Sequence, residues 1–328
     1  MEPKPIFLTG ATGFLGRHVV AHLLRGGRKL VLAVRDWSRC PAEWNGRPEI
    51  SIFETGELGP YTDFGDALNG VGAVVHLAGL AHVAAGDGQG EDAAFMRANA
   101  GATGALARAA AAAGASTFVH ASSLAAIAPN ALDRTIDDST ELGPSTPYGR
   151  SKRLAESHVR TLADNGVFAV SLRPPLIVGA DARGNWAALQ ALAHTGLPLP
   201  FASIRNRRAF IGVEALSEAI ALLCEKPWPA ELSGNYAIAD RELLSLPEVT
   251  RLLREGMGRP ARLLPLPAPA FDMIGALTGR RRRIAGLTGN LLVDASRFER
   301  IFGFQPSVSL REEIVRSGKE YAASREAK

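Results

Sequence analysis

The sequence predicts an α/β fold: a doubly wound parallel sheet of the Rossmann type, followed by a smaller C-terminal lobe that faces the substrate. Three observations support this prediction. Short, wholly apolar runs alternate with longer segments of helical periodicity through the first half of the chain. Wholly apolar strands are typical of parallel sheets that helices cover on both faces. A glycine-rich turn between the first strand and the first helix is typical of dinucleotide-binding folds.

The predicted elements of the first half follow one another as strand, helix and strand. Residues 6–9 form an apolar strand, and residues 15–24 carry apolar side chains at helical spacing until Gly26 and Gly27 end the helix. Further strands are predicted at residues 30–34, 50–53, 73–77, 117–121 and 168–172, and further helices at residues 92–113 and 148–163. This order places helices on both sides of one sheet.

The composition of the sequence changes after Arg173-Pro174-Pro175, where prolines and glycines become frequent and the predicted helices and strands become shorter. We therefore divide the chain into a dinucleotide-binding domain, 1–175, and a mainly substrate-binding lobe, 176–328. Helices are predicted in the second part at residues 213–224, 247–256 and 310–321. Residues 209–211 and 236–238 resemble strands, so the segments 209–225 and 236–240 are candidates to return to the first domain.

The composition is that of an ordinary globular protein, with 46% hydrophobic and 21% charged residues. Cys40 and Cys224 lack the spacing of a disulfide framework or a zinc module, so no metal site is expected. The net charge of +4 comes from dispersed arginines, apart from the run Arg280–Arg283. Dispersed charge favours small phosphate-bearing ligands over nucleic acid. The run itself could bind a diphosphate, lie on an anionic membrane or be a solvated loop.

A strand that begins within the first ten residues leaves no place for a signal peptide. No apolar run reaches the length that a transmembrane helix needs. We therefore expect a cytoplasmic protein without a transmembrane segment.

The glycine-rich turn reads Gly10-Ala-Thr-Gly13-Phe-Leu-Gly16. Glycine lets the backbone approach a pyrophosphate closely, and the N-terminus of the following helix offers free N–H groups and a positive dipole. At the end of the second strand stand Arg35 and Asp36. An acid there holds the ribose hydroxyls of NAD, whereas an arginine can hold the 2′-phosphate of NADP. Because the arginine comes first, we expect NADP(H), with NAD(H) as the alternative.

Tyr148 and Lys152 stand four residues apart on a predicted helix, so their side chains share one face. An ammonium beside a phenol is expected to lower the phenol pKa towards neutrality and to make the tyrosine a proton donor or acceptor. Ser122 and Ser123 follow the fifth strand, at the sheet edge where parallel sheets place their sites. A hydroxyl there can hydrogen-bond the oxygen that Tyr148 serves.

Taken together, these motifs resemble the extended short-chain dehydrogenases/reductases, in the branch of nucleotide-sugar epimerases, dehydratases and 4-reductases, and the chain is UDP-glucose 4-epimerase-like. The resemblance runs through nearly the whole chain. It rests on the glycine loop, Gly56-Glu57-Leu58, His76-Leu-Ala-Gly79, Asn99, Ser122-Ser123, Tyr148, Lys152, Arg173-Pro174, Gly184-Asn185, Asn206-Arg207-Arg208-Ala-Phe-Ile and Val293-Asp-Ala-Ser296.

The resemblance implies roles for individual residues. Tyr148 is the acid/base, Lys152 its electrostatic and ribose-binding partner, and Ser123 the residue that polarises the sugar oxygen. The cofactor site would comprise Gly10, Gly13, Phe14, Leu15, Gly16, Arg35, Glu57, Leu58, Ala78, Gly79, Asn99, Tyr148, Lys152 and Pro175. Asn99 could equally bond the backbone of a neighbouring loop. Asn185 and Arg208 would bind the substrate diphosphate, although Arg208 could instead pair with a nearby acid.

Departures from the family pattern narrow the expected reaction. Sugar 4,6-dehydratases carry an acid pair where Leu124 and Ala125 stand, so dehydration is not expected. Leu176 replaces an asparagine that contacts the sugar phosphate in many epimerases. We expect NAD(P)-dependent oxidoreduction at C4 of a UDP-linked sugar, as a 4-keto-sugar reductase in polysaccharide or O-antigen sugar synthesis. The alternatives are a 4-epimerase with retained NAD, an NADPH reductase of a non-sugar carbonyl and a non-catalytic NADP sensor. The resemblance also makes a homodimer possible.

Overall fold

The structure is a computed structural model that describes residues 3–81, 89–267, 270–271 and 281–326. A seven-stranded sheet lies at its centre, in the order β10-β7-β5-β4-β1-β2-β3, and every neighbouring pair is parallel. The strands are β1 (Ile6–Thr9), β2 (Leu30–Val34), β3 (Ile50–Glu54), β4 (Ala73–His76), β5 (Thr117–Ala121), β7 (Phe168–Arg173) and β10 (Gly234–Ala237). This order confirms the predicted doubly wound fold.

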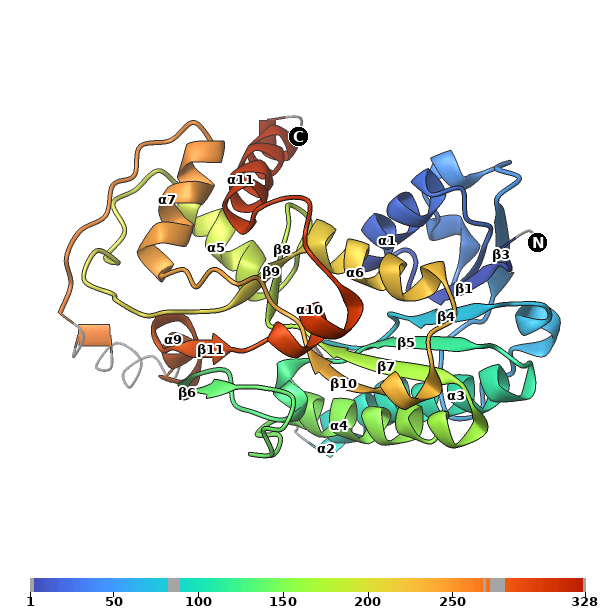
Figure 1. Cartoon of the computed structure of the whole chain (residues 1–328). Coiled ribbons are helices and arrows are strands. Elements are labelled where there is room, and N and C mark those ends of the chain that lie inside the picture. The colour runs from blue at the N-terminus through green and yellow to red at the C-terminus, as the bar shows by residue number, and fades with distance from the viewer. Residues whose placement is uncertain (1–2, 82–88, 268–269, 272–280, 327–328) are drawn as a thin grey trace.

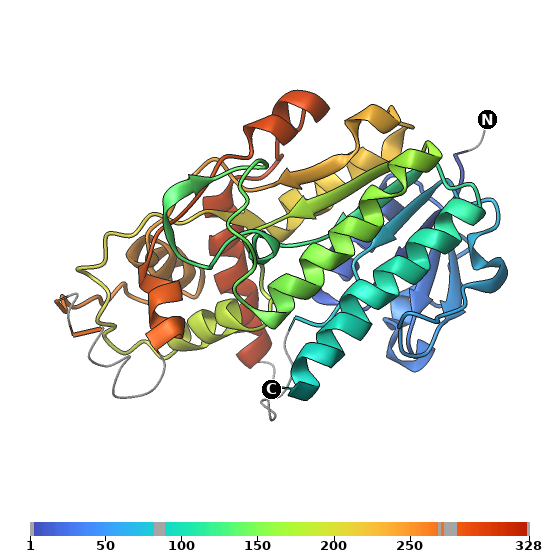
Figure 2. The same ribbon diagram turned by 90° about the horizontal axis from the view of Figure 1, so that it is seen from below.

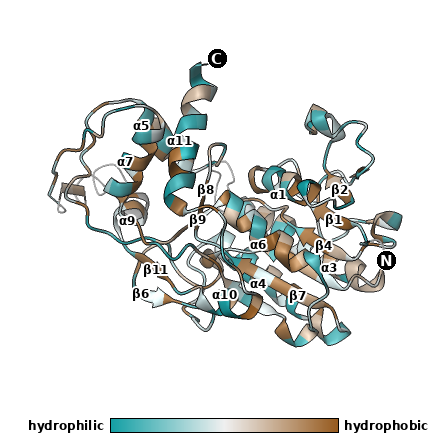
Figure 3. Ribbon diagram, turned by 45° about the horizontal axis from the view of Figure 1, so that its top comes forward, coloured by the Kyte–Doolittle hydropathy of each residue, from teal (hydrophilic) through white to brown (hydrophobic). Residues whose placement is uncertain are grey.

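Helices cover both faces of the sheet (Figure 1 and Figure 2). One layer contains α1 (Phe14–Arg25) and α6 (Val213–Glu225), and the other contains α3 (Ala102–Ala112) and α4 (Pro147–Arg160). Side chains alternate along β1 accordingly: Ile6 and Leu8 pack in the core beneath α1 and α6, and Phe7 packs in the core beneath α3 and α4. Figure 3 shows the hydrophobic strands between helices that carry hydrophilic residues.

The helix predicted at residues 92–113 is interrupted. It consists of α2 (Gln89–Phe95), a π-helical turn at Met96–Gly101, and α3. A π-turn inserts an extra residue into the helix and is often found at functional sites. Short 3-10 turns occur at η1 (Trp37–Arg39), η2 (Ala42–Trp44), η3 (Gly65–Leu68), η5 (Leu124–Ala126), η6 (Ala163–Asn165) and η7 (Ala230–Leu232).

The second lobe has its own core, in which α5 (Asn185–His194), α7 (Leu246–Gly256) and α11 (Leu310–Glu326) pack together. Two small parallel sheets join it to the first part: β8 (Leu176–Val178) with β9 (Phe210–Gly212), and β6 (Leu132–Ile136) with β11 (Leu291–Val293). The helices α9 (Arg281–Thr288) and α10 (Ser296–Phe302) complete the described part of the lobe. None of the helices in the described ranges is long and apolar enough to cross a bilayer.

The two strand-like segments of the second half take different places. Residues 209–211 do not rejoin the large sheet, because β9 pairs with β8. Residues 234–237 form β10, which adds to β7 as the edge strand of the large sheet. The helix α6 packs in the same core as α1. Of the arginine run, Arg280 lies outside the described residues and Arg281 begins α9.

Candidate functional site

The glycine loop folds tightly at the end of β1. Gly10 has a φ of 75°, and a Cβ there would lie 2.6 Å from the backbone nitrogen of Ala78. A Cβ at Gly16 would collide with the carbonyl oxygen of Gly10, and the Gly13 amide donates to that same oxygen at 3.0 Å. The first turn of α1 has neither an acidic residue nor a side-chain cap. The loop is therefore a backbone cradle at a free helix N-terminus, which suits a pyrophosphate.

Phe14 and Leu15 follow this cradle, and their side chains pack into the protein. The Phe14 ring is 5.6 Å from the His18 ring, and it lies so close to Gly179 that a Cβ there would be 2.7 Å from Cζ. Leu15 is partly buried against the core beneath α1. At these two positions, the backbone amides of the first helical turn remain for an anion.

The end of β2 carries the charges that were predicted to select the cofactor. Arg35 Nη1 lies 3.8 Å from Glu57 Oε1, and the two side chains are 59% and 83% exposed. The Asp36 carboxylate instead accepts hydrogen bonds from the Ser38 amide at 3.0 Å and the Ser38 hydroxyl at 2.6 Å, and these bonds lower its pKa. Leu58 packs against the core on the α3 side. Arg35 therefore keeps an open guanidinium, while Asp36 caps η1.

Tyr148, Lys152 and Ser123 meet at the carboxyl edge of the sheet. The helix α4 begins at Pro147, and its N-cap residue Thr146 accepts a hydrogen bond from the Gly149 amide at 3.0 Å. Lys152 Nζ donates to the carbonyl oxygen of Ala121 at 2.7 Å. Burial lowers the pKa of Lys152 to about 8. The lysine is therefore a buried cation directly behind the end of β5.

The pKa of Tyr148 differs from the expectation. Burial raises it above its ordinary value, and a hydrogen bond with the Ser123 side chain opposes that rise only in part. The predicted lowering by Lys152 is absent because the lysine ammonium is directed to the Ala121 carbonyl. The ring of Phe95 packs edge-on at 5.9 Å from the Tyr148 ring. Tyr148 is thus held as a neutral phenol next to Ser123.

The two adjacent serines have different partners. Ser123 Oγ accepts a hydrogen bond from the Ala125 amide at 3.2 Å and caps η5, and its side chain also interacts with Tyr148. Ser122 is buried and donates to Glu156 Oε1 at 2.6 Å. Ser123 is accordingly the serine whose side chain interacts with Tyr148.

Asn99 lies in the π-helical turn and is buried. Its Oδ1 accepts from the Leu80 amide at 2.7 Å, and its Nδ2 donates to the Leu80 carbonyl at 3.0 Å and to Ser151 Oγ at 2.9 Å. All these contacts bind the loop after β4 to α4. In this structure, Asn99 has the loop-bonding role that was the alternative to a cofactor contact. A Cβ at Gly79 in that loop would lie 2.9 Å from Asn99 Oδ1 and 3.4 Å from Lys152 Nζ.

Two of the predicted substrate residues, Asn185 and Arg208, belong to the second lobe. Arg208 donates to the Gly289 carbonyl at 2.7 Å and to the Asn130 carbonyl at 2.9 Å. Burial lowers its pKa to about 10, and no carboxylate in the described ranges forms an ion pair with it. Among the described residues, the partners of Arg208 are therefore backbone carbonyls and not an acid. Asn185 is exposed at the start of α5, and Pro175 is partly buried between β7 and β8.

Sequence reasoning missed a buried ion pair behind this site. Arg173 at the end of β7 donates to Glu156 through Nε at 2.8 Å and Nη2 at 2.7 Å. The same carboxylate accepts from Ser122, and its charge raises the pKa of Lys152 against the effect of burial. Glu156 stands one helical turn after Lys152, so the spacing of tyrosine, lysine and glutamate along α4 was the available signal.

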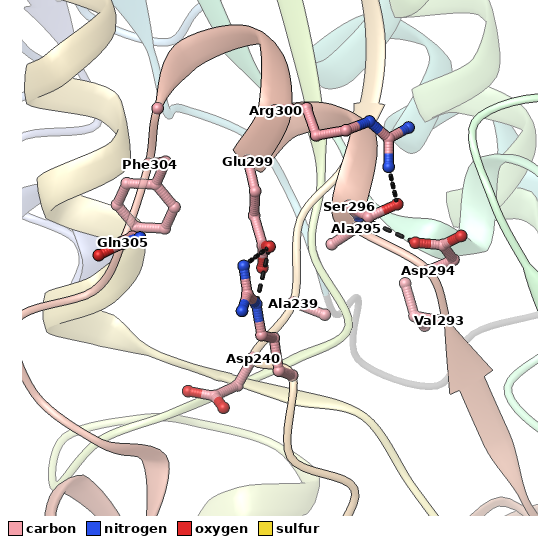
Figure 4. A pocket seen from close by; sticks show the side chains of 12 residues that line it. Ala239, Asp240, Val293, Asp294, Ala295, Ser296, Glu299, Arg300, Phe304 and Gln305 are labelled. Atoms are coloured by element: carbon pink, nitrogen blue, oxygen red, sulfur yellow. Dashed lines mark hydrogen bonds and ion pairs between the residues drawn. The ribbon is translucent and has the colours of Figure 1, made fainter.

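A cavity of about 510 Å³ lies elsewhere, between the ends of β10 and β11 and the helix α10. Figure 4 shows Glu299, Asp294 and Arg300 around it, with Arg300 donating to Ser296 at 2.8 Å. None of the residues predicted for the cofactor or the substrate lines this cavity. The sequence Val293-Asp-Ala-Ser296 is used here for an Asp294-to-Ser296 turn that starts α10.

Comparisons with known proteins place the chain beside a family that uses a dinucleotide cofactor, for which the glycine cradle is suited. The model of the NAD-dependent epimerase/dehydratase family matches residues 6–239. The chain is 30% identical over 327 residues to a UDP-glucose 4-epimerase of Vibrio cholerae, covering 97% of this chain and 96% of that protein. It is 33% identical over 277 residues to a ceramide reductase of Caulobacter vibrioides, covering 83% of this chain and 76% of that protein.

A solved structure shares the fold. The UDP-glucuronic acid 4-epimerase from Bacillus cereus in complex with NAD superimposes with a TM-score of 0.76 at 17% identity, covering 98% of this chain and 99% of that one. At this identity, the likeness concerns the fold.

Proposed function

Because the chain belongs to the NAD-dependent epimerase/dehydratase family, we propose that it catalyses NAD(P)-dependent oxidoreduction at C4 of a UDP-linked sugar. The observation that carries the proposal is the meeting of Tyr148, Lys152 and Ser123 at the carboxyl edge of the sheet. In the second lobe, Arg208 adds a partly buried guanidinium without a carboxylate partner among the described residues. An arginine in that state suits a diphosphate.

The residues around the cradle fit a dinucleotide cofactor. Gly10, Gly13 and Gly16 leave backbone space that a Cβ would fill, and the free N-terminus of α1 suits the pyrophosphate. When bound, such a cofactor supplies or accepts the hydride. We propose NADP(H) as the preferred form, because Asp36 is engaged in capping η1, whereas Arg35 is exposed and has a 3.8 Å surface ion pair with Glu57 to exchange for a 2′-phosphate.

The chain's own residues supply the proton chemistry. Tyr148 is a neutral phenol and can donate its proton to the oxygen that develops negative charge at C4. Ser123 can hydrogen-bond the same oxygen, since its side chain already contacts Tyr148. The Lys152 ammonium, one helical turn from Tyr148, would stabilise the tyrosinate that forms after the transfer once it turns from the Ala121 carbonyl towards that oxygen. Leu124 and Ala125 begin η5 without a carboxylate, so these positions cannot supply the acid and base for dehydration.

Two reactions use this arrangement, and we propose reduction of a 4-keto sugar as the first. Arg35 supports it, because a reductase that consumes its cofactor suits NADPH. The second candidate is 4-epimerisation through a transient ketone, which the end-to-end similarity to the Vibrio cholerae epimerase favours. The experiment is incubation with UDP-linked 4-keto and 4-hydroxy sugars, comparing NADPH with NADH. Stoichiometric NADPH consumption supports the reductase; interconversion without consumption, with tightly held NAD, supports the epimerase.

A third candidate, reduction of a non-sugar carbonyl, is favoured by the similarity to the Caulobacter vibrioides ceramide reductase. The substitution Arg208→Ala separates it from the sugar reactions. For a nucleotide sugar, loss of a charge-assisted contact to the diphosphate is expected to raise KM about tenfold or more. Arg207→Ala is the matched control, because the exposed neighbour lacks the buried carbonyl contacts of Arg208. An unchanged KM in both variants would favour the non-sugar substrate.

A further inference from the structure

Two segments of the second lobe lie side by side at the end farthest from β3, as Figure 1 and Figure 2 both show. They are residues 196–205, after α5, and residues 259–267, after α7, and we call them together the distal tip. The Leu199 amide donates to the Arg262 carbonyl at 2.9 Å, and the Leu264 amide donates to the Leu199 carbonyl at 2.8 Å. The two segments are therefore joined by backbone hydrogen bonds.

A buried arginine of α7 forms hydrogen bonds with backbone carbonyls in and beside the distal tip. Arg254 on α7 is fully buried, and its guanidinium donates to the carbonyls of Leu197 at 2.5 Å, Ala193 at 3.2 Å and Arg262 at 3.1 Å. All of these acceptors are neutral. Burial lowers the pKa of Arg254, and the charge of the nearby Arg259 adds to the effect. The distal tip is thus rigidly held around a positive charge that no carboxylate in the described ranges neutralises.

The distal tip exposes leucines that this framework holds in place. Leu197 is 65% exposed and Leu264 is 54% exposed, although the Leu264 backbone is hydrogen-bonded within the tip and the Leu197 carbonyl accepts from Arg254 of α7. Pro200 and Pro265, beside them, are also exposed. The two leucines thus lie exposed on neighbouring segments that backbone hydrogen bonds join, and exposed apolar side chains on adjacent segments can form an interaction surface.

The charged side chains of the distal tip are all positive. Arg205 and Arg262 are exposed and Arg259 is half-buried, and none of the three forms an ion pair within the described parts of the chain. In the sequence, residues 192–212 contain no acid, and residues 257–290 contain Asp272 as their single acid beside Arg280–Arg283. An exposed apolar surface bordered by unpaired arginines is complementary to a surface that is apolar within and anionic outside.

We propose that the distal tip docks on the surface of an anionic lipid bilayer. Leu197 and Leu264 would enter the interface between headgroups and acyl chains, while Arg205, Arg259 and Arg262 would meet the lipid phosphates. Two distal tips would repel each other, because both are cationic, which argues against a second copy as the occupant. Nucleic acid would leave the leucines without a partner. The surface is independent of Tyr148 and of the proposed reaction.

The test is co-sedimentation of the full chain with vesicles of phosphatidylcholine, with and without phosphatidylglycerol. Binding is expected only with the anionic lipid and should weaken as salt rises. The variant Arg205→Gln/Arg262→Gln should bind about 25-fold more weakly, at roughly fivefold for each charge near the surface. Leu197→Asp/Leu264→Asp should abolish binding. NADPH binding, measured in solution, should be unchanged in both variants.

Matched controls lie on other faces of the molecule. Arg47→Gln/Arg160→Gln removes two exposed arginines, and Tyr61→Asp removes an exposed apolar ring, so both should bind vesicles as the unmodified chain does. No binding to anionic vesicles would overturn the proposal, as would binding that the control variants weaken equally. A dimer in solution that the leucine variant dissociates would also overturn it and would assign the tip to a second copy.

Discussion

At the scale of single residues, the pKa values of Tyr148 and Lys152 depend more on burial than on the direct pairing that their spacing of four residues suggests. Tyr148 and Lys152 stand one helical turn apart, yet the ammonium is hydrogen-bonded to the Ala121 carbonyl, and the phenol interacts with Ser123. Burial moves both pKa values toward the neutral forms, upward for the phenol and downward for the ammonium. The pair is therefore set to donate a proton from tyrosine.

Replacing Tyr148 by phenylalanine tests the proton donor. The variant keeps the ring that packs against Phe95 and loses only the hydroxyl. We expect kcat to fall about 100-fold to 10,000-fold, as for loss of a general acid. Cofactor affinity, measured by fluorescence titration, should change little. Undiminished turnover would contradict the assignment.

The pKa of Lys152 predicts the pH dependence of turnover. With a pKa near 8, the lysine is an ammonium below this pH and a neutral amine above it. The raised pKa of Tyr148 keeps the phenol protonated through the same range. We therefore expect kcat/KM to fall as the pH rises through about 8, and kcat/KM is measured over about two units on either side. A profile that stays flat to well above pH 9 would argue against a catalytic charge on Lys152.

At the scale of elements, α4 carries Tyr148 and Lys152 on the side that faces the sheet, and a buried ion pair holds the helix there. Glu156 and Arg173 are 3% and 6% exposed, and Ser122 satisfies one of the same carboxylate oxygens. The pair joins α4 to the ends of β5 and β7. Tyr148 and Lys152 consequently keep their positions relative to Ser123.

Glu156→Ala tests this fastening. The substitution leaves the Arg173 guanidinium buried without its partner, so the free energy of unfolding should fall by about 3–5 kcal/mol. Asp92→Ala is the matched control, because the Arg150–Asp92 pair is about half exposed on both sides. Its loss should cost about 1 kcal/mol or less. Urea denaturation measures the free energy of unfolding of both variants. Equal losses would show that the buried pair contributes no more to stability than the exposed pair.

Several of the helices and strands that build the site could be predicted from the sequence. The periodicity of residues 15–24, the apolar strands and the helix after Thr146 are local patterns, and the structure confirms them as α1, β1, β2 and α4. The π-turn around Asn99 could not be predicted, since nothing in the sequence of Met96–Gly101 marks where an extra residue enters the helix. The pairing of β8 with β9 also depends on chain segments about 30 residues apart.

At the scale of the whole molecule, the division at residue 175 does not follow the packing. The strand β10 extends the large sheet, and α6 fills the core beside α1. Phe298 and Phe302 of α10 pack on Tyr236 of β10, with rings 6.0 Å and 5.2 Å away. We propose that the two parts form one cooperative unit.

A fragment that ends at residue 175 tests this proposal. It lacks β10 and α6, so β7 becomes an unpaired edge and the apolar face beneath α6 is exposed. We expect the fragment to be unfolded or aggregated, with no cooperative thermal transition by circular dichroism. The full chain is the control. A soluble fragment with a sharp transition would show that residues 1–175 are an independent domain.

The doubly wound sheet, the glycine cradle and the helix that places Tyr148 and Lys152 on one face could be predicted from the amino-acid sequence, because each depends on local spacing along the chain. The directions of the side chains in the site follow from the folded arrangement. It placed the Lys152 ammonium on Ala121, the Asp36 carboxylate on Ser38 and the Arg208 guanidinium on two backbone carbonyls. The direction of a side chain and its pKa depend on burial and on partners distant in sequence, and folding alone brings these together.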